Sequence, residues 1–543
     1  MRYVPRLCVM FVLSIGTGTA FGWTLQPTPM PLGPADIAQS ITTKDVTQGV
    51  RFAQIKRGAL SASEYWTVNL GFFHDAEAAK ADLAAIAALG FTPRLDPGAG
   101  RDAAGRALGV WLSVGRFATQ DEANDAAAAI TKAGGTKFRP FARNTALAGD
   151  PATGPWLINV LAIDPHSFTG HLAVALPGGD DLGDGGETVS EAVARTQALA
   201  GVNGSFFTNI NPAHARLPPR APVGATVIDG RLVAAATGGK PGFAIRRDAT
   251  GRTSAALLPK LSTQITLSDG TGQSIAIRTI DRPLLGTVVN CGTPAEAPTT
   301  RPAHDVTCTN HDDLVLYDAL YLRGTASNSV VDAGYHGLVV EVLVGADGVV
   351  RDRHGGIGQA APSGGFVLQG LGRSAAWLAA HAAPGAKLSV TRKLFSDGHE
   401  IPLEPGLSVL EGGPTLLVAH LLDNAAAEGH GPTVAGADQG EGAAIANDNW
   451  YNGWVIGRNG RTDIGVTADG TILLVEIDGR NPAISLGTSI EETDAVMRWL
   501  GCTQALNLDG GGSSNMVVGG VSVGHPSDAT GERGVGDTIL VLP

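Results

Sequence analysis

The chain has 543 residues, 43% of them hydrophobic and 17% charged, which is typical of a globular protein too long for one ordinary core. Its net charge of −12 and the lack of any basic block argue against nucleic acid as a partner. The 74 glycines favour many strands and turns over long helices.

The first residues predict an export signal. Arg2 and Arg6 precede a short apolar run, and the small residues that follow fit cleavage before Trp23. The run is too short for a permanent membrane-spanning helix, and no later segment is apolar enough to cross a bilayer. We therefore expect residues 1–22 to be a signal peptide. The mature protein would be exported to the periplasm, the cell envelope or the extracellular space, without a transmembrane segment.

Two features follow the signal. Residues 23–60, with the stretch PTPMPLGP, predict a poorly ordered leader. Residues 61–145 contain an internal repeat in which each half runs as strand, glycine-aromatic turn, alanine-rich helix, glycine and strand. Asp75 and Thr119 stand where the helix caps belong. Two such halves predict a small ferredoxin-like βαβ-repeat domain with both helices on one face of its sheet.

This repeat resembles the sporulation-related repeat (SPOR) domain, because both halves between Tyr65 and Arg143 carry its VxLGxF…A…L…G pattern. The resemblance implies binding to peptidoglycan glycan strands on the exposed face of the sheet. A generic ferredoxin-like spacer is the alternative. Trp66 and Trp111 are candidates for stacking on sugars, and their alternation suits burial equally well. Residues 146–155 predict a linker by their composition.

Residues 156–543 predict one large unit of mixed α+β fold. Apolar strand-like segments alternate with glycine turns, and several are joined by a DG or GADG hairpin. Helical patterns are few, at about residues 188–200, 375–383 and 489–500. Mixed sheets with a handful of packing helices follow from this pattern.

Seven motifs succeed one another in this unit. They are GVNGSFF (201–207), VLYDALYLRGTASN (315–328), PSGGFVLQGLG (362–372), VLEGGPTLL (409–417), GRTDIGVTADGTILLVEIDGR (460–480), SLGTSIEETDAVMRWLGC (485–502) and ALNLDGGGSSNMVV (505–518). Their succession resembles the phosphodiester glycosidase family, whose best-known member is the lysosomal uncovering enzyme that removes N-acetylglucosamine from a phosphodiester on mannose. The resemblance implies a hydrolase acting on a sugar-1-phosphodiester of the N-acetylglucosamine type, in an envelope polymer or a phosphorylated glycan. The alternatives are a glycosidase for phosphate-free envelope glycans and a non-catalytic wall-binding protein.

Breaking a sugar-1-phosphodiester needs an anionic group near the sugar ring and cationic or N–H donors near the phosphate. Asp509 is our first choice for the carboxylate. The N–H groups of Gly510, Gly511 and Gly512 form a candidate nest for the phosphate, which would explain the glycine run. Arg461 resembles the family's arginine and suits a bidentate phosphate contact.

Other residues of the motifs are weaker candidates. Asn203 suits contact with a sugar hydroxyl or a metal. The alternative is that Asn203 is a turn residue in the left-handed backbone conformation and contacts no ligand. Glu492 matches a glutamate of the family, on a helix where a charged residue is otherwise solvated. The remaining substrate-binding candidates are Ser513, Ser514, Asp478, Arg480, Glu411, Gly412 and Gly413. Glu411 departs from the family's glycine-rich stretch and bears on the shape of the pocket.

This chemistry requires no cofactor, and a divalent cation, calcium or magnesium, is the open alternative. The stretch GGDDLGDGGE offers Asp180, Asp181, Asp184 and Glu187, but without the regular alternation of an EF-hand. No zinc motif is present in the sequence.

Cysteines and one insert complete the sequence features. Cys291 and Cys308 predict a disulfide, and Cys502 predicts a buried thiol. Residues 420–454 form an insert that is a specificity lid or flexible filler, with equal support for each. The oligomeric state does not follow from the sequence.

Overall fold

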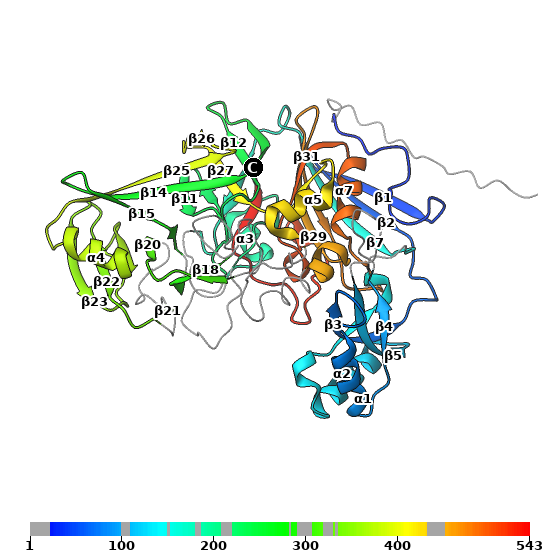
Figure 1. Cartoon of the computed structure of the whole chain (residues 1–543). Helices are drawn as coiled ribbons and strands as arrows, with labels where there is room; N and C mark the ends of the chain where they lie inside the picture. The colour runs from blue at the N-terminus through cyan, green and yellow to red at the C-terminus, as the bar shows by residue number, and fades with distance from the viewer. Residues whose placement is uncertain are drawn as a thin grey trace, which may run out of the picture.

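The computed structural model describes residues 22–98, 109–148, 152–179, 186–207, 220–281, 284–289, 307–318, 330–331, 335–431 and 451–543. The expected signal peptide lies outside these residues, except for Gly22. The fold is mixed α+β with several sheets, as the sequence predicts. Figure 1 shows a central region, a lobe around α4 on one side, and a smaller lobe containing α1 and α2.

The central region is built on a seven-stranded antiparallel sheet with the order β1-β2-β7-β30-β29-β31-β28. Its strands are β1 (Gln39–Thr47), β2 (Val50–Arg57), β7 (Trp156–Ile163), β30 (Ile472–Ile477), β29 (Arg461–Thr467), β31 (Cys502–Asn507) and β28 (Thr415–Leu416). Every residue of β7, β29 and β30 is buried. Both faces of the sheet are therefore covered, which explains why β7 and β30 are almost continuously apolar, whereas β29 buries the polar residues Arg461, Thr462 and Asp463.

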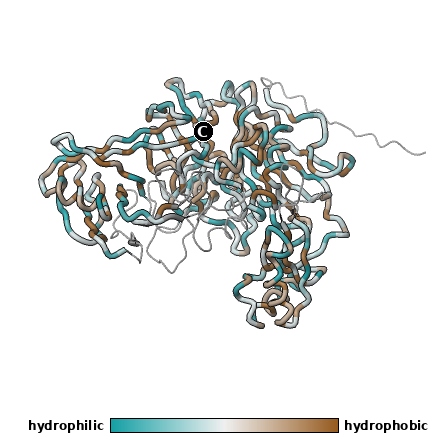
Figure 2. Tube along the Cα trace, viewed as in Figure 1, coloured by the Kyte–Doolittle hydropathy of each residue, from teal (hydrophilic) through white to brown (hydrophobic). Residues whose placement is uncertain are grey.

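Two layers cover this sheet. On one face, α7 (Ile490–Trp499) packs Val496 and Met497 against Val475 and Ile477 in one core. On the other face lies a five-stranded sheet with the order β33-β32-β9-β34-β8, covered in turn by α3 (Val189–Thr196). These five strands are Val521–Ser522, Met516–Val518, Ala200–Asn203, Thr538–Leu542 and His171–Ala175. Hydrophobic residues gather where these layers meet (Figure 2).

Another five-stranded sheet, β11-β10-β27-β12-β13, joins the same core through Phe243, Ile245 and Leu410. Its strands are Arg231–Ala234, Thr226–Ile228, Leu407–Glu411, Gly242–Arg247 and Thr253–Leu258. The side lobe contains α4 (Gly372–His381) and two sheets. These sheets comprise β15 (Ser274–Ile277), β14 (Leu261–Asp269), β25 (Leu388–Ser396) and β26 (His399–Ile401), and β16 (Thr279–Ile280), β20 (Leu314–Asp318), β24 (Phe366–Leu371), β22 (Val339–Val344) and β23 (Val350–Gly355). There are also two short pairs, β17 (Leu284–Leu285) with β21 (Val330–Val331) and β18 (Thr287–Val289) with β19 (Thr307–Thr309).

The predicted leader is wrong as a disordered segment, because residues 39–57 form β1 and β2 of the main sheet. Trp23, Met30 and Leu32 are at most 5% exposed and pack into the core beneath α7. The proline-containing composition suggested disorder, but these three apolar side chains anchor the extended segment. Residues 22–57 therefore belong with residues 156–543, and we call the two together the main body.

Met30 tests this assignment. We expect Met30→Ala to lower the free energy of unfolding of the whole main body by about 2–5 kcal/mol, because a side chain 1% exposed would leave a cavity. Urea unfolding followed by tryptophan fluorescence would measure the loss. Thr42→Ala, at an exposed position of β1, is the control and should change stability by less than about 0.5 kcal/mol. A leader that does not pack would give equal, small effects for both variants.

Residues 58–155, here called the inserted module, connect the neighbouring strands β2 and β7 of the main sheet. The module has the predicted ferredoxin-like form, an antiparallel sheet of order β4-β5-β3-β6 with two helices packed on one face through Ile86 and Ile130. Its elements are β3 (Trp66–Phe73), α1 (Lys80–Ala88), β4 (Pro93–Pro97), β5 (Val110–Phe117), α2 (Gln120–Lys132), η1 (Gly135–Phe138), β6 (Phe141–Asn144) and η2 (Thr145–Ala148).

Local signals set the helix ends only in part. Thr119 caps α2 with a capping box, as its position predicts. Asp75 instead accepts a hydrogen bond from the N–H of Ala78 in a preceding turn, so α1 begins only at Lys80. The three predicted helices of the main body correspond to α3, α4 and α7.

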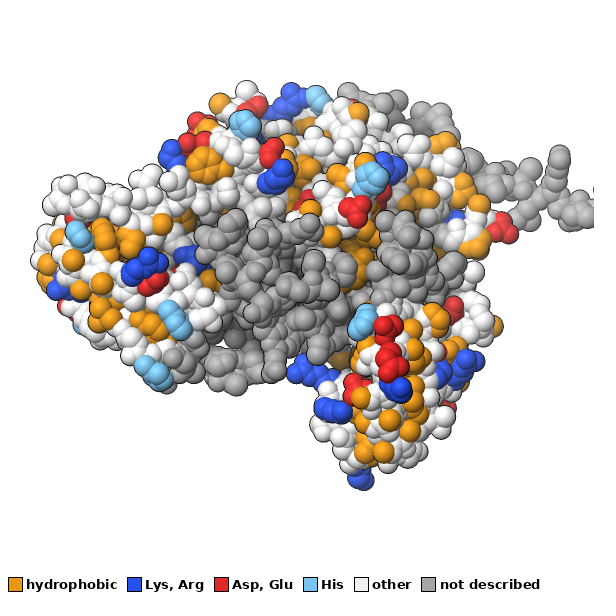
Figure 3. All heavy atoms as spheres, in the orientation of Figure 1, with side chains coloured by type: hydrophobic (Ala, Val, Ile, Leu, Met, Phe, Trp, Pro, Cys, Tyr) orange, Lys and Arg blue, Asp and Glu red, His pale blue; other side chains and the backbone are white. Residues whose placement is uncertain are grey.

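Among the described residues, every helix is too short or too polar to cross a bilayer. On the face shown in Figure 3, the acidic and basic side chains of the described residues are interspersed.

Candidate functional site

Asp509 lies just beyond the end of β31, where two strand ends from different sheets meet. Its N–H donates to the carbonyl of Gly204 at 3.1 Å, and its carbonyl accepts from the side-chain amide of Asn203 at 2.8 Å. Asn203 is fully buried, and its Oδ1 accepts from the hydroxyl of Thr462 at 2.5 Å. Asn203 therefore holds the backbone of Asp509, a contact that accounts for its side chain without a ligand.

The glycine run after Asp509 leaves space for two arginines. Gly511 has a φ of +63°, and a Cβ there would lie 2.7 Å from Nη2 of Arg480. A Cβ at Gly512 would collide with Arg533. The N–H of Gly510 donates to Oδ1 of Asp509 at 2.8 Å and that of Gly511 to a backbone carbonyl at 2.8 Å. The predicted three-donor nest therefore has at most the N–H of Gly512 left for a ligand.

Two guanidinium groups stand beside Asp509. The Arg533 side chain donates from Nε to Asp528 at 2.7 Å and from Nη1 to the hydroxyl of Ser513 at 3.3 Å. Arg480 is exposed to solvent and donates from Nε to Oδ1 of Asn459 at 2.7 Å. The Arg533 and Asp528 side chains are 27% and 25% exposed. Arg480 and Arg533 therefore form a positively charged surface beside the Asp509 loop that solvent can reach. We call this surface the arginine wall.

Arg220 extends this wall. Its guanidinium lies over the ring of Phe207 at 5.7 Å and donates to the carbonyl of Gly534. Desolvation lowers the pKa of Arg220, and the nearby charge of Arg533 lowers it further, while Asp528 opposes both. Mutual repulsion of this kind arises where guanidinium groups converge, and an anion bound among them would relieve it.

The pKa of Asp509 is shifted toward neutrality, the range in which a carboxyl group can act as an acid or a base in catalysis. Burial among surrounding protein atoms raises its pKa to about 6, although hydrogen bonds from Ser513 and Gly510 and the charges of Arg533 and Arg480 oppose the rise. The side chain nevertheless keeps partial exposure. A carboxylate that is largely desolvated, shifted in pKa and still reached by solvent is a candidate for catalysis.

Arg461 does not form the predicted pair with Asp509. Its side chain is fully buried on the opposite face of β29, where Nε donates to the carbonyl of Thr488 at 2.9 Å and Cζ lies 4.5 Å from the centre of the Trp454 ring. Desolvation lowers the pKa of Arg461 to about 9, and the charged neighbours that act on it include Asp463 but not Asp509. The guanidinium groups whose charges act on Asp509 are those of Arg533 and Arg480, not that of Arg461.

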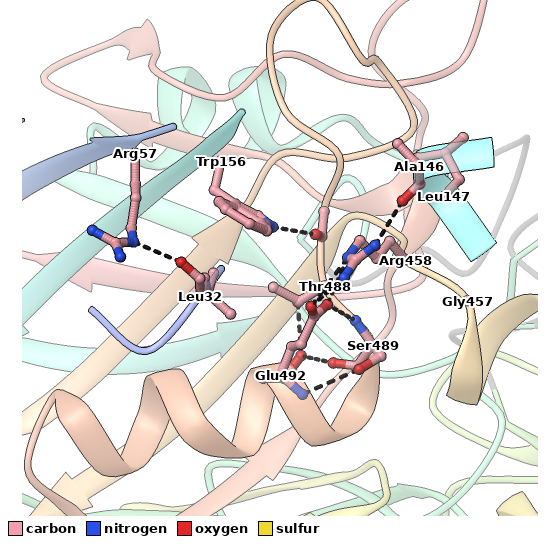
Figure 4. A network of polar contacts seen from close by, with 12 residues as sticks. Leu32, Arg57, Ala146, Leu147, Trp156, Gly457, Arg458, Thr488, Ser489 and Glu492 are labelled. Carbon is pink, nitrogen blue, oxygen red and sulfur yellow. Dashed lines mark hydrogen bonds and ion pairs between the residues drawn. The ribbon is translucent and has the colours of Figure 1, made fainter. Parts of the chain in front are cut away.

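Glu492 also has contacts that differ from the prediction. It is the third residue of α7 and closes a capping box with Ser489, accepting from the N–H of Ser489 at 3.0 Å. Its carboxylate forms an ion pair with Arg458 at 2.6 Å. Figure 4 shows these contacts, which give Glu492 a structural role at the start of α7.

A substitution separates these roles of Glu492. We expect Glu492→Gln to lower the free energy of unfolding by about 2–4 kcal/mol, because the Arg458 side chain, 2% exposed, would lose its counter-ion. On an N-acetylglucosamine-1-phosphodiester, the substrate class that the family resemblance implies, the kcat of the folded variant should stay within about threefold of that of the native chain. Urea unfolding and turnover measured at a temperature where both proteins are folded would test this. A large loss of kcat with unchanged stability would restore the catalytic prediction.

The remaining candidates lie at different depths. The Glu411 carboxylate, 2% exposed, accepts from the N–H of Ala225 at 2.8 Å and from Thr237, and burial raises its pKa. Gly413 donates its N–H to Asn507 at 2.8 Å, and a Cβ at Gly412 would lie 2.7 Å from the carbonyl of the same residue. Glu411, Gly412 and Gly413 therefore make buried contacts within the protein, to Ala225, Thr237 and Asn507.

Asp478, Ser513 and Ser514 are the other predicted candidates. Asp478 accepts from Nδ1 of His525 at 2.6 Å and from its N–H at 2.7 Å, which fixes the loop that precedes Asp528. The hydroxyl of Ser514 is buried and has no hydrogen-bond partner among the described residues, whereas Ser513 bonds both Asp509 and Arg533. Of the predicted residues, the structure thus brings together Asp509, Asn203, the glycine run, both serines and Arg480.

Sequence reasoning missed Arg533 and Arg220. Both occur in loops, in the stretches GERGVGD and LPPRAP, where no strand or helix period marks a functional side chain. A pair of charged residues, Glu532 and Arg533, between two glycines was the available signal.

The metal and cysteine predictions are only partly covered. Asp180, Asp181 and Asp184 lie outside the described residues, and Glu187 pairs with Arg195 at 2.7 Å. Among the described residues, no group of three or more acidic, histidine or cysteine side chains is placed to hold a metal ion. Cys502 is a buried free thiol, as predicted. Cys291 and residues 432–450 of the insert are outside the described part, so the disulfide and the lid stay predictions.

Comparison with known proteins agrees with this architecture. The phosphodiester glycosidase family model matches residues 336–542, and the SPOR domain model matches residues 62–142. The chain is 60% identical to a protein of Burkholderia pseudomallei K96243 with a solved crystal structure, covering 96% of this chain and 100% of that one with a TM-score of 0.90.

Two further similarities are more limited. The catalytic domain of zebrafish N-acetylglucosamine-1-phosphodiester alpha-N-acetylglucosaminidase, auto-inhibited by pro-peptide, is 10% identical over 96% of each chain, with a TM-score of 0.35. The SPbeta prophage-derived uncharacterized protein YomE of Bacillus subtilis (strain 168) is 37% identical over 81 residues, which are 15% of this chain and 12% of that protein. The chain therefore spans about an eighth of the length of that curated relative.

The matched residues of the larger model include Asp509 and the arginines at 480 and 533. The match to the SPOR model falls within the inserted module. The chain therefore contains a phosphodiester glycosidase domain, matched over residues 336–542, and it carries a SPOR domain between two neighbouring strands of its main sheet.

Proposed function

We propose that this protein is an exported hydrolase that cleaves a sugar-1-phosphodiester, of the N-acetylglucosamine type, in a cell-envelope polymer or glycan. The observation that carries the proposal is the partly exposed carboxylate of Asp509, with a pKa of about 6, beside the guanidinium groups of Arg480 and Arg533. The phosphodiester glycosidase domain supports the general class of glycan hydrolase. The site's combination of charges supports a substrate that carries phosphate.

The two charges suit the two ends of the bond that breaks. Arg480 and Arg533 would hold the phosphate oxygens through charge-assisted hydrogen bonds, with Arg220 adding positive charge at the rim. The anionic form of Asp509 would face the anomeric carbon and stabilise the positive charge that develops there. The bond from the anomeric carbon to oxygen breaks, and its electron pair leaves with the phosphomonoester. Water then adds to the anomeric carbon and gives up a proton, which releases the free sugar.

Location at the cell wall is the second part of the proposal. The SPOR domain supports binding to peptidoglycan glycan strands, and the predicted signal peptide would bring the chain to them. A soluble phosphodiester should need only the main-body site, whereas the wall-bound substrate should need both parts.

Product analysis tests the function. We expect the purified chain to release free N-acetylglucosamine and a phosphomonoester from an N-acetylglucosamine-1-phosphodiester, and Asp509→Asn to release both about 10³-fold more slowly. Release of sugar from phosphate-free wall glycans alone would favour an ordinary glycosidase. No release from either substrate, with wall binding retained in both proteins, would favour a non-catalytic wall-binding protein.

A further inference from the structure

The inserted module is joined to the main body by two covalent connections that lie side by side. Arg57, the last residue of β2, pairs with Trp156, the first residue of β7, so the module leaves and re-enters the sheet at facing positions. Ala59 donates its N–H to the carbonyl of Thr153 at 2.9 Å, and the Thr153 hydroxyl donates to the carbonyl of Ala59 at 2.7 Å. These bonds fasten the two connections to each other.

The segment predicted as a linker is in part a docked element. Ala146 and Leu147 of η2 are 3% and 8% exposed and belong to the core beneath α7. The carbonyl of Ala146 accepts from Nη1 of Arg458 at 2.7 Å, and the carbonyl of Leu147 accepts from the N–H of the same arginine at 3.0 Å. Figure 4 shows η2, Arg458 and Glu492 joined in one polar network. The composition of this segment, rich in alanine and glycine, hid its packing.

The module also presents one face of its sheet to the junction. The helices cover the face that carries Leu112 and Val114, so the alternate residue Trp111 lies on the other face. Arg143 of β6 stacks over Trp111 at 4.8 Å and donates from Nη2 to the carbonyl of Leu147 at 2.8 Å. A Cβ on Gly457 of the main body would lie 3.0 Å from that Nη2. Of the two alternatives for Trp111, burial is the one observed, because its side chain is 7% exposed beneath Arg143. This end of the sheet face therefore packs at the junction, next to the segment that leads from Gly457 to Arg461.

A single flexible tether would raise the local concentration of the enzyme at the wall without fixing its orientation. The two connections and the docked η2 give up that freedom. A fixed orientation is useful when the bond to be cleaved lies at a constant distance from the glycan strand that the module binds. Binding of the glycan then places that bond in the site and lowers the activation barrier.

We infer that the inserted module and the Asp509 site act as one rigid unit on one polymer. The phosphodiester to be cleaved is carried by the same glycan strand that the module binds, as a decoration linked through a sugar-1-phosphoryl group. This inference rests on the proposed function and adds the class of its natural substrate.

Uncoupling the module tests the inference. Flexible Gly-Ser segments of ten residues are inserted after Ala59 and after Asn144, so that the module is freed while η2 stays docked, and the same segment inserted at the turn of Gly251 serves as the control. The uncoupled variant should keep kcat/KM on a soluble N-acetylglucosamine-1-phosphodiester and the Kd for purified glycan strands within about twofold. Its release of sugar from decorated wall polymer should fall by about tenfold or more.

A point variant keeps the test independent of the insertions. Arg143→Ala removes the stacking on Trp111 and the bond to Leu147, and it should lower release from the polymer while sparing the soluble substrate. Lys132→Ala, exposed on α2, is the matched control. Equal polymer release by the native and uncoupled chains would overturn the inference, as would loss of the soluble activity on uncoupling. A native chain inactive on both substrates would overturn the proposed function and this inference with it.

Discussion

Asp509→Asn is expected to lower kcat/KM on an N-acetylglucosamine-1-phosphodiester by about 10³-fold. The substitution keeps the size of the side chain but removes the negative charge that would face the anomeric carbon. The backbone of Asp509 is held by Gly204 and by Asn203, so the loop should stay in place. Steady-state kinetics, with thermal unfolding to verify the fold, would measure the effect.

The pH dependence of the native chain gives a second measure of the same carboxylate. Because the ionised form is the active one and the pKa of Asp509 is about 6, kcat/KM should rise about tenfold per pH unit below 6 and level off above it. The rise should be absent from the residual activity of Asp509→Asn. Asp397→Asn, at an exposed aspartate, is the control and should retain both the native rate and the native profile. Full activity of the Asp509 variant would remove this residue from the mechanism.

The sequence predicts the position of Asp509 but not the partners of its charge. A single aspartate followed by three glycines marks a loop that needs bare backbone, and the structure explains the need by the arginines packed against Gly511 and Gly512. Arg461 was a reasonable partner from the motif alone. The strand that carries it is buried on both faces, so its hydropathy does not alternate and the sequence does not tell which face meets the site. The neighbouring Thr462, not Arg461, points toward Asn203.

Tertiary contacts of high sequence separation decided the other differences. β1 and β2 are polar at many positions, and their place in the sheet depends on pairing with β7 about a hundred residues later. The linker prediction failed for the same reason, since Ala146 and Leu147 become apolar anchors only when α7 supplies the surface beneath them. By contrast, the periodic helices at 188–200 and 489–500 were predicted well, because capping boxes at Thr188 and Ser489 fix their starts locally.

The arginine wall gives the other large effect. We expect Arg480→Met and Arg533→Met each to lower kcat/KM on the phosphodiester by about 10- to 100-fold, because each removes a charge-assisted contact to phosphate worth about 1.5–3 kcal/mol. Each variant should also move the acid limb of the pH profile above 6, since both guanidinium groups hold the pKa of Asp509 down against the effect of burial. Kinetics from pH 4.5 to 8.5 would measure both changes.

The combination of a weaker rate and a shifted profile distinguishes a charge in the site from a packing defect. Arg373→Met, at an exposed arginine of the side lobe, is the matched control and should alter neither. Arg461→Met should instead lower stability, because its guanidinium bonds backbone carbonyls inside the core, and the variant that remains folded should keep the native acid limb. A shifted limb in Arg461→Met with an unchanged limb in Arg480→Met and Arg533→Met would return the phosphate contact to Arg461. The profile therefore reports which guanidinium group acts on Asp509 even where the rates are similar.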